Sequence, residues 1–197
     1  MLHLLRRLRI RHKRFGEQHF RSRERFRPDY RRLATSLLAR LDFDSVLDIG
    51  CANGFLLEAF QAAGKRVAGV ELSSAAVAVL PESLRPHITI GDFAAASGRW
   101  DLVSCVEVAE HIEPSRSTEL VDTVSGAAAR HVYFTAAPPG QSGRGHINCR
   151  EHVEWLDWFA ARGWVLDDQR TEALRADLES LELAVWLRGN SLILRRG

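Results

Sequence analysis

The 197-residue sequence has few of the residues on which several classes of protein depend. Its three cysteines, Cys51, Cys105 and Cys149, are odd in number and have no metal-type spacing, so the sequence indicates neither a disulfide framework nor a cysteine-rich metal site. No apolar run approaches the length of a bilayer span, and we predict no transmembrane segment. These absences are typical of a cytoplasmic protein whose thiols are free and buried.

Lysine is also scarce: Lys13 and Lys65 are the only two, and arginine supplies the other basic residues, as is typical of a GC-rich bacterial genome. The net charge is only +2, but residues 1–32 hold twelve Arg or Lys and three Asp or Glu, a charge of +9 that leaves about −7 for the rest. We therefore divide the chain into a basic N-terminal arm, 1–27, and a single domain, 28–197. The arm is interpreted either as a surface for anionic lipid, RNA or an acidic partner, or as a solvated helix covering the substrate side of the fold. The second interpretation is favoured, because runs of charge usually face water.

Strand-like and helix-like segments alternate along the domain, and 46% of the sequence is apolar, as in globular proteins. The alternation predicts a doubly wound α/β fold with a mostly parallel seven-stranded sheet, helices on both faces and an antiparallel last strand. The expected strands are 45–49, 66–71, 87–90, 100–106, 131–136, 164–166 and 191–194. The expected helices are 28–41, 55–64, one after Ser73, one after Pro114, 151–162 and a longer one carrying Leu174, Leu178, Leu181 and Val185.

Residues 45–54, Ser-Val-Leu-Asp-Ile-Gly-Cys-Ala-Asn-Gly, join an apolar strand to a helix through a glycine-containing turn. We expect Asn53 to cap this helix and Gly64 to end it. A strand, turn and helix of this kind open nucleotide-binding domains. A dinucleotide fingerprint is excluded because Ala52 and Phe55 occupy its second and third glycine positions, and no Gly-Lys-Ser/Thr follows to make a phosphate loop. A nucleoside without phosphates fits instead.

The run Asp48-Ile49-Gly50-Cys51-Ala52-Asn53-Gly54 resembles the first motif of the class I S-adenosylmethionine-dependent methyltransferases, and the resemblance extends over roughly residues 45–195. Trp100-Asp101-Leu102-Val103, followed by Glu107-Val108-Ala109-Glu110-His111, resembles the fourth-strand motif of this family, which borders the methyl group. Ala52 departs from the pattern, because the family more often has glycine there. We expect tolerated crowding rather than lost binding.

The resemblance implies S-adenosyl-L-methionine as the cofactor and S-adenosyl-L-homocysteine as its product. It places Glu71 on the two ribose hydroxyls, Asp92 near the adenine amino group and Phe93 against the ring. A carboxylate suits the ribose because it accepts two hydroxyl hydrogen bonds at once. The expected cofactor-binding residues are Asp48, Gly50, Cys51, Ala52, Asn53, Gly54, Glu71, Leu72, Asp92, Phe93, Glu107 and Val108.

His111, His146 and Glu107 are the catalytic candidates. On one turn of helix, Glu107 would share a face with Glu110 or His111, where they would hold a divalent cation or pair His111 as a base. The same pattern resembles the metal-binding part of small-RNA 2′-O-methyltransferases and of some quinone-biosynthesis O-methyltransferases, with His146 or His152 standing in for a later histidine. We favour His111 lining the site without a metal.

The glycine-rich loop before His146 should cover the acceptor site, and the segment 138–148 resembles loops of bacterial methyltransferases that act on sugars and secondary metabolites. We favour methyl transfer to a hydroxyl, less so to an amine, of a small molecule such as a glycan unit or a secondary metabolite. Metal-dependent RNA 2′-O-methylation and a cofactor-binding module without activity are the alternatives. The sequence leaves the acceptor and the oligomeric state open.

Overall fold

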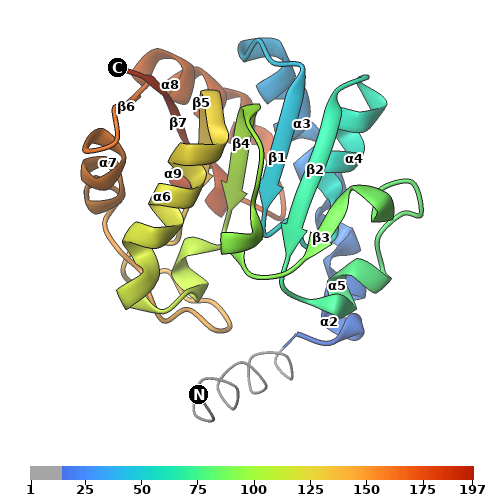
Figure 1. Ribbon diagram of the computed structural model, residues 1–197. Coiled ribbons are helices and arrows are strands. Elements are labelled where there is room, and N and C mark those ends of the chain that lie inside the picture. The colour runs from blue at the N-terminus through green and yellow to red at the C-terminus, as the bar shows by residue number, and fades with distance from the viewer. Residues whose placement is uncertain (1–14) are drawn as a thin grey trace.

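The structure is a computed structural model that describes residues 15–197, so the predictions for residues 1–14 lie outside the described residues. Within this range seven strands form one sheet, in the order β3-β2-β1-β4-β5-β7-β6. The strands are β1 (Ser45–Ile49), β2 (Arg66–Glu71), β3 (Ile88–Ile90), β4 (Trp100–Val106), β5 (Ala128–Thr135), β6 (Trp164–Leu166) and β7 (Leu192–Arg196). β7 pairs antiparallel with both β5 and β6, and the other pairs are parallel, which confirms the predicted sheet (Figure 1).

Helices cover both faces of this sheet, as the sequence predicts. They are α2 (Glu17–Ser22), α3 (Arg27–Arg40), α4 (Phe55–Ala62), α5 (Ser74–Ala78), α6 (Ser117–Ala127), α7 (His152–Ala160), α8 (Asp168–Asp177) and α9 (Trp186–Asn190). Side chains of α3, α4, α8 and α9 belong to one apolar core, and those of α6 and α7 belong to a second. Figure 1 shows α6 in front of the strands and α3 and α4 behind them. Residues 102–106 of β4 are all buried between these layers, which explains their continuous apolar run.

The predicted elements are confirmed with shifts of up to three residues at their ends, except for one helix. The single long helix predicted across residues 174–185 is wrong, because the chain leaves the helical conformation between α8 and α9. Asp29 explains the break: its Oδ2 accepts hydrogen bonds from the backbone N–H groups of Leu183 and Ala184, at 3.0 and 2.6 Å. A carboxylate that satisfies two backbone donors stabilises a non-helical turn. The turn brings Trp186, at the start of α9, to the wall of the main cavity.

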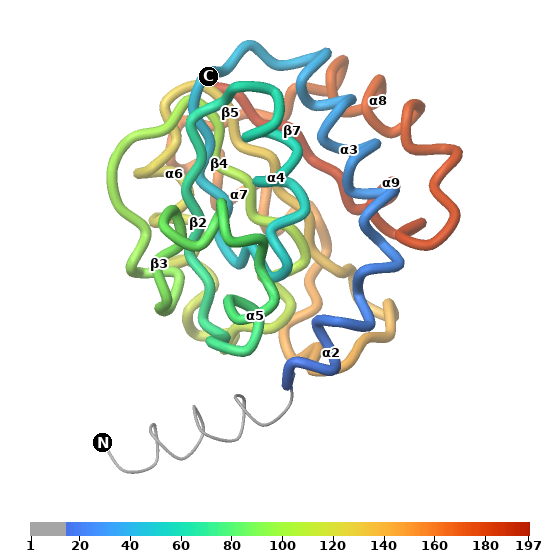
Figure 2. Tube along the Cα trace, turned by 90° about the vertical axis from the view of Figure 1, so that its right-hand side faces the viewer, coloured from blue at the N-terminus to red at the C-terminus, as the bar shows by residue number. Residues whose placement is uncertain are grey.

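The carboxyl ends of the parallel strands meet at one edge of the sheet. Figure 1 shows the arrows of β1, β2 and β4 pointing to the lower part of the view, where α2 and α5 lie, and Figure 2 places α2 at the same end after a 90° turn. Ligands of doubly wound folds bind at this edge. Of the helices in residues 15–197, none has the length and apolar character needed to cross a bilayer.

Candidate active site

The loop after β1 is shaped by glycine. Gly50 has a φ of +76°, and a Cβ there would lie 2.4 Å from Cγ2 of Val108, so only glycine fits between the two loops. Gly54 has a φ of +68°, and a Cβ there would lie 2.6 Å from a methyl of Leu80. Ala52 also has a positive φ, +45°, which L-residues with a Cβ adopt at a cost. Alanine at position 52 therefore brings a backbone cost, from its positive φ, in addition to the crowding expected from its methyl group.

Glu71, at the end of β2, is fastened to this loop. Its two carboxylate oxygens accept hydrogen bonds from the backbone N–H groups of Ala52, at 2.8 Å, and Ser73, at 2.7 Å. Burial raises the pKa of Glu71, and these backbone donors oppose that rise. Each oxygen has a second lone pair, so the carboxylate retains acceptor capacity for two hydroxyls.

Asp48 and Asn53 lie on either side of the same loop. Asp48 accepts a hydrogen bond from the hydroxyl of Ser104 at 2.7 Å, and burial raises its pKa to about 7. Asn53 does not cap α4 as predicted: no side chain caps this helix, and Nδ2 of Asn53 instead donates to the carbonyl of Phe20 at 2.8 Å. Gly54, not Asn53, is the residue before the helix, and it has the left-handed conformation, so the side chain of Asn53 points towards α2.

Asp92 and Phe93 follow β3 and share one arginine that the sequence analysis missed. Arg116 forms a bidentate pair with Asp92, both N···O distances being 2.8 Å, and its guanidinium carbon lies 4.2 Å from the centre of the Phe93 ring. Bidentate pairing with a carboxylate fixes both the position and the plane of the guanidinium. Arg116 thus holds the Phe93 ring and the Asp92 carboxylate side by side after β3, where the adenine of the cofactor is expected.

The basic segment contributes a roof over the cavity, which agrees with the favoured interpretation that the arm covers the substrate side, although the sequence singled out none of its side chains. Phe20 is 5% exposed, and Phe15, Phe20 and Arg23 all line the cavity. Phenylalanines in a highly charged segment were the available signal, because large apolar side chains in such a segment usually pack against the fold. The described part of the basic arm therefore contacts the candidate site.

The roof and the strand ends enclose a cavity of about 450 Å³. The structure brings nearly all the predicted site residues to its wall, and the exception is Gly54, which lies beneath the loop against α5 and the residues that follow it. The predicted residues at the wall are Asp48, Gly50, Cys51, Ala52, Asn53, Glu71, Leu72, Asp92, Phe93, Glu107, Val108, Glu110, His111 and His146.

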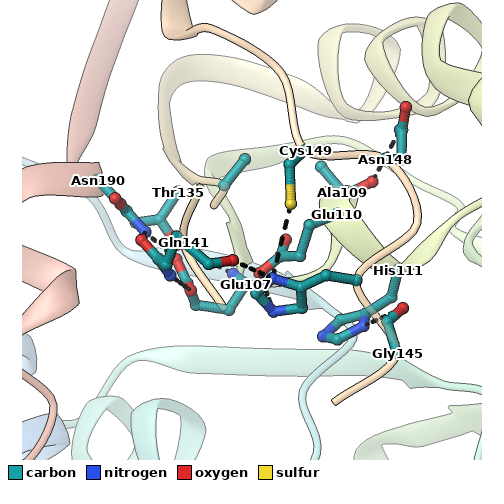
Figure 3. A network of polar contacts seen from close by, with 12 residues as sticks. Glu107, Ala109, Glu110, His111, Thr135, Gln141, Gly145, Asn148, Cys149 and Asn190 are labelled. Carbon is teal, nitrogen blue, oxygen red and sulfur yellow. Dashed lines mark hydrogen bonds and ion pairs between the residues drawn. The ribbon is translucent and has the colours of Figure 1, made fainter. Parts of the chain in front are cut away.

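Glu107 does not share a helical turn with Glu110 and His111, so that expectation is wrong. Its φ is +55°, and the 3₁₀ turn that follows spans only Ala109–His111. The carboxylate of Glu107 accepts hydrogen bonds from the amides of Asn190, at 3.0 Å, and Gln141, at 3.4 Å (Figure 3). Two distant segments therefore fix the carboxylate of Glu107, which also interacts with the carboxyl of Glu110.

Glu110 is the most deeply buried acid of the site. Its side chain is fully buried, and among the described residues no N–H or hydroxyl group donates to either carboxyl oxygen; the neighbouring polar group is the carboxyl of Glu107, with which Glu110 hydrogen-bonds when protonated. Burial, with the neighbouring charge of Glu107, raises the pKa of Glu110 to about 9. The carboxyl group is therefore protonated at neutral pH, with Oε1 3.9 Å from Nε2 of His146.

His111 and His146 lie together, with ring centres 5.0 Å apart. Nδ1 of His111 is 3.1 Å from the carbonyl oxygen of Gly145, and Nδ1 of His146 is 3.0 Å from that of Gln141. A carbonyl only accepts, so each Nδ1 carries the proton and each Nε2 carries the lone pair. Figure 3 shows His111 beside Gly145 in this network.

His152 and Cys149 follow the cavity-lining His146 in the chain. His152 does not line the cavity, and its Nε2 lies 3.1 Å from the carbonyl oxygen of Ala136, so His146 is the later histidine of the site. Cys51 and Cys105 are free and buried as predicted, whereas Cys149 is free but only partly buried, with Sγ 3.6 Å from Nδ1 of His146.

Three side chains lie close enough together to hold a metal ion, but they are not the three that the sequence predicts. Ligand atoms of Glu110, His111 and His146 all lie within 4.8 Å of one another, and Glu107 is not part of this group. Oxygen and imidazole nitrogen suit a divalent transition metal, but binding would first require the Glu110 carboxyl to lose its proton. The preference for a site without metal stays a prediction.

Comparison with known proteins agrees with this geometry. The family model described as "Methyltransferase domain" matches residues 11–142. A ubiquinone biosynthesis O-methyltransferase of Aromatoleum aromaticum is 42% identical over 82 residues, covering 37% of this chain and 35% of that protein. A protein of the same name from Paraburkholderia xenovorans is 34% identical over 96 residues, covering 44% of this chain and 41% of that protein. The chain thus spans well under half the length of these curated relatives.

The similarity in fold extends further than the similarity in sequence. The crystal structure of magnesium protoporphyrin IX methyltransferase from Synechocystis PCC 6803 with bound SAM matches with a TM-score of 0.68 and 17% identity, covering 96% of this chain and 97% of that chain. At this identity the match supports the fold, and the roles of individual residues rest on the geometry above.

Proposed function

Because the chain belongs to the family of class I S-adenosylmethionine-dependent methyltransferases, we propose that it transfers the cofactor's methyl group to a hydroxyl of a small molecule. The observation that carries this proposal is the His111–His146 pair, whose Nδ1 atoms are both bound to carbonyl oxygens. Both rings line the cavity: His111 ends the segment that resembles the methyl-bordering motif, and His146 follows the glycine-rich loop. A hydroxyl acceptor needs a base of this kind to become a good nucleophile.

The residues around β1, β2 and β3 fit the cofactor. Glu71 would accept the ribose hydroxyls, since the backbone donors fix its carboxylate but leave lone pairs free. Phe93 and the Asp92–Arg116 pair would hold the adenine ring and its amino group. Gly50 gives the backbone close approach to the bound molecule.

When bound, S-adenosylmethionine supplies a methyl group already activated on a sulfonium, so the protein has to position the acceptor and remove its proton. We assign the base to Nε2 of His111, with His146 as its neighbour, because the Gly145 carbonyl fixes the tautomer of His111. Oε1 of Glu110 lies 3.9 Å from Nε2 of His146, and burial raises the pKa of this carboxyl group. The names of the curated relatives, O-methyltransferases, support a hydroxyl rather than an amine.

The test compares two acceptors that share a ring and differ in the accepting atom. The protein is incubated with methyl-labelled S-adenosylmethionine and either catechol or o-phenylenediamine, and the products are separated by mass spectrometry. We expect the label on the oxygen of catechol. Transfer to the diamine alone would contradict the proposal. Absence of label in any acceptor under single-turnover conditions would favour a binding module without activity.

The group formed by Glu110, His111 and His146 supports a second candidate, metal-dependent methylation of RNA 2′-hydroxyls. A chelator separates the two candidates. Transfer to catechol that survives EDTA, with no label entering total RNA, would support the small-molecule enzyme. Label in RNA that is lost with EDTA and restored by a divalent cation would support the alternative.

A further inference from the structure

Three arginines line the cavity, and their partners differ. Arg116 is neutralised twice, by Asp92 and by Glu119 at 2.7 Å. Among residues 15–197, no carboxylate lies within ion-pair distance of Arg23 or Arg144. Nη2 of Arg23 donates a hydrogen bond to the hydroxyl of Tyr30 at 3.5 Å, and the charge of Arg23 lowers the pKa of Glu71. Two guanidinium groups at the cavity wall thus lack a fixed counter-charge.

Both arginines belong to the roof: Arg144 is next to Gly145, which holds His111, whereas the charge of Arg23 also acts on Glu71. The guanidinium carbon of Arg144 lies 5.7 Å from the centre of the Phe15 ring, which is itself 4.7 Å from His19 and 6.0 Å from His111. The pKa of His19 is lowered by burial and then by the charges of Arg23 and Arg144, so both charges act at the same point of the roof. Arg23 comes from the segment after α2 and Arg144 from the loop before α7.

The acids at this end of the cavity do not balance these charges. Glu110 interacts with Glu107 and lies 3.9 Å from Nε2 of His146, and neither arginine is within ion-pair distance of it. The amides of Asn190 and Gln141 hold the carboxylate oxygens of Glu107. Among the described residues, the two guanidinium groups are therefore not paired with an acid at this end of the cavity. Guanidinium groups bind carboxylate and phosphate in bidentate geometry, which makes an oxyanion the matching ligand.

We propose that the acceptor carries an oxyanion, a carboxylate or a phosphate, in addition to the hydroxyl that is methylated, and that Arg144 and Arg23 bind this group. The inference rests on the proposed function and specifies its substrate class. With the oxyanion held at the roof, the hydroxyl of the acceptor is directed towards His111, which Phe15 contacts from the roof side.

The test uses three acceptors that share a catechol ring and differ in charge: 3,4-dihydroxybenzoate, catechol and dopamine. We expect kcat/KM to fall in that order, with dihydroxybenzoate preferred over catechol by about tenfold or more. Arg144→Gln and Arg23→Gln should each raise KM for dihydroxybenzoate about tenfold and leave catechol nearly unchanged. Arg99→Gln is the matched control, because Arg99 is exposed and does not line the cavity. Competition by benzoate and by phenyl phosphate separates the carboxylate from the phosphate.

The outcomes distinguish this inference from the function on which it rests. Equal kcat/KM for the three catechols would overturn the oxyanion site and leave methyl transfer intact. If no catechol is methylated, but dihydroxybenzoate binds the S-adenosylhomocysteine complex in an Arg144-dependent manner, the oxyanion site stands and the proposed reaction fails. If Arg144→Gln instead weakens S-adenosylhomocysteine binding tenfold in calorimetry, Arg144 serves the cofactor and the inference is wrong.

Discussion

In the half of the cavity formed by β1, β2 and β3, the acids are held by backbone N–H groups and by Arg116, and each lies within a few residues of a strand end. In the half formed by His111, His146 and the roof, loop residues hold the groups: Gly145 holds His111 across 34 residues, whereas Gln141 holds His146 from five residues away. Glu107 there binds Asn190, which is 83 residues distant. We call these the cofactor half and the acceptor half.

The difference shows how one fold combines a constant site with a variable one. Strand ends in a parallel sheet fix the cofactor half, because changing it means changing the sheet. The acceptor half consists of α2, the loop before α7 and the start of α9, which can change without disturbing the strands. Its charge pattern, with two arginines that have no carboxylate partner among residues 15–197, is therefore where the specificity of this chain would lie.

The largest expected effect tests whether chemistry belongs to the acceptor half. We predict that His111→Ala lowers kcat by about 10²- to 10⁴-fold, the usual contribution of a general base, while S-adenosylhomocysteine affinity stays nearly the same. Stopped assays and calorimetry measure the two quantities separately. His152→Ala is the control, since it removes an imidazole outside the cavity. Equal losses of turnover and cofactor affinity in His111→Ala would show that this histidine has a structural role. The distinction between a cofactor half and an acceptor half would then be wrong.

The next effect tests the cofactor half. Glu71→Ala should weaken S-adenosylhomocysteine binding by ~1–3 kcal/mol, the range for lost hydrogen bonds to a charged partner. Glu71→Gln should lose less, because the amide retains one acceptor oxygen. Calorimetry that finds unchanged affinity in Glu71→Ala would remove the ribose assignment.

The two halves also differ in how much the sequence predicts. Gly50, Glu71, Asp92 and their strands are found from local patterns, because a strand followed by a turn carries its own signal. The contact of Glu107 with Asn190 depends on where the chain leaves the helix between α8 and α9, and there the backbone donates hydrogen bonds to Asp29, more than 150 residues away. Such long-range contacts have no local pattern, which is why the predicted helical turn at Glu107 was wrong.

A pH experiment tests the neutral charge of the acceptor half. The pKa of Glu110 is about 9 in the folded protein and near its ordinary 4.5 in the unfolded chain. Between these values the folded state holds one more proton, so this group favours folding at low pH and its contribution falls as pH rises towards 9. Glu110→Gln removes the titration, so the free energy of unfolding of this variant should fall less between pH 5 and pH 8 than that of the wild type.

Denaturant unfolding at pH 5, 7 and 8 measures this difference. Glu82→Gln, which alters an exposed acid outside the cavity, controls for the general loss of one negative charge. A wild-type profile that is parallel to that of Glu110→Gln across this range would show an ionised Glu110. The acceptor half would then be less positive than proposed, and its preference for oxyanions would weaken with it.

The smallest effect concerns Ala52, the one departure from the family pattern in the cofactor half. Its φ of +45° costs an L-residue energy that glycine does not incur, whereas glycine has the more flexible unfolded chain. Ala52→Gly should therefore raise the free energy of unfolding by up to about 1 kcal/mol. Ala63→Gly, at a φ of −84°, is the matched control and should lower it by about 0.5–1 kcal/mol. If both substitutions destabilise equally, the alanine is not strained, and the turn after β1 tolerates a methyl group at no conformational cost.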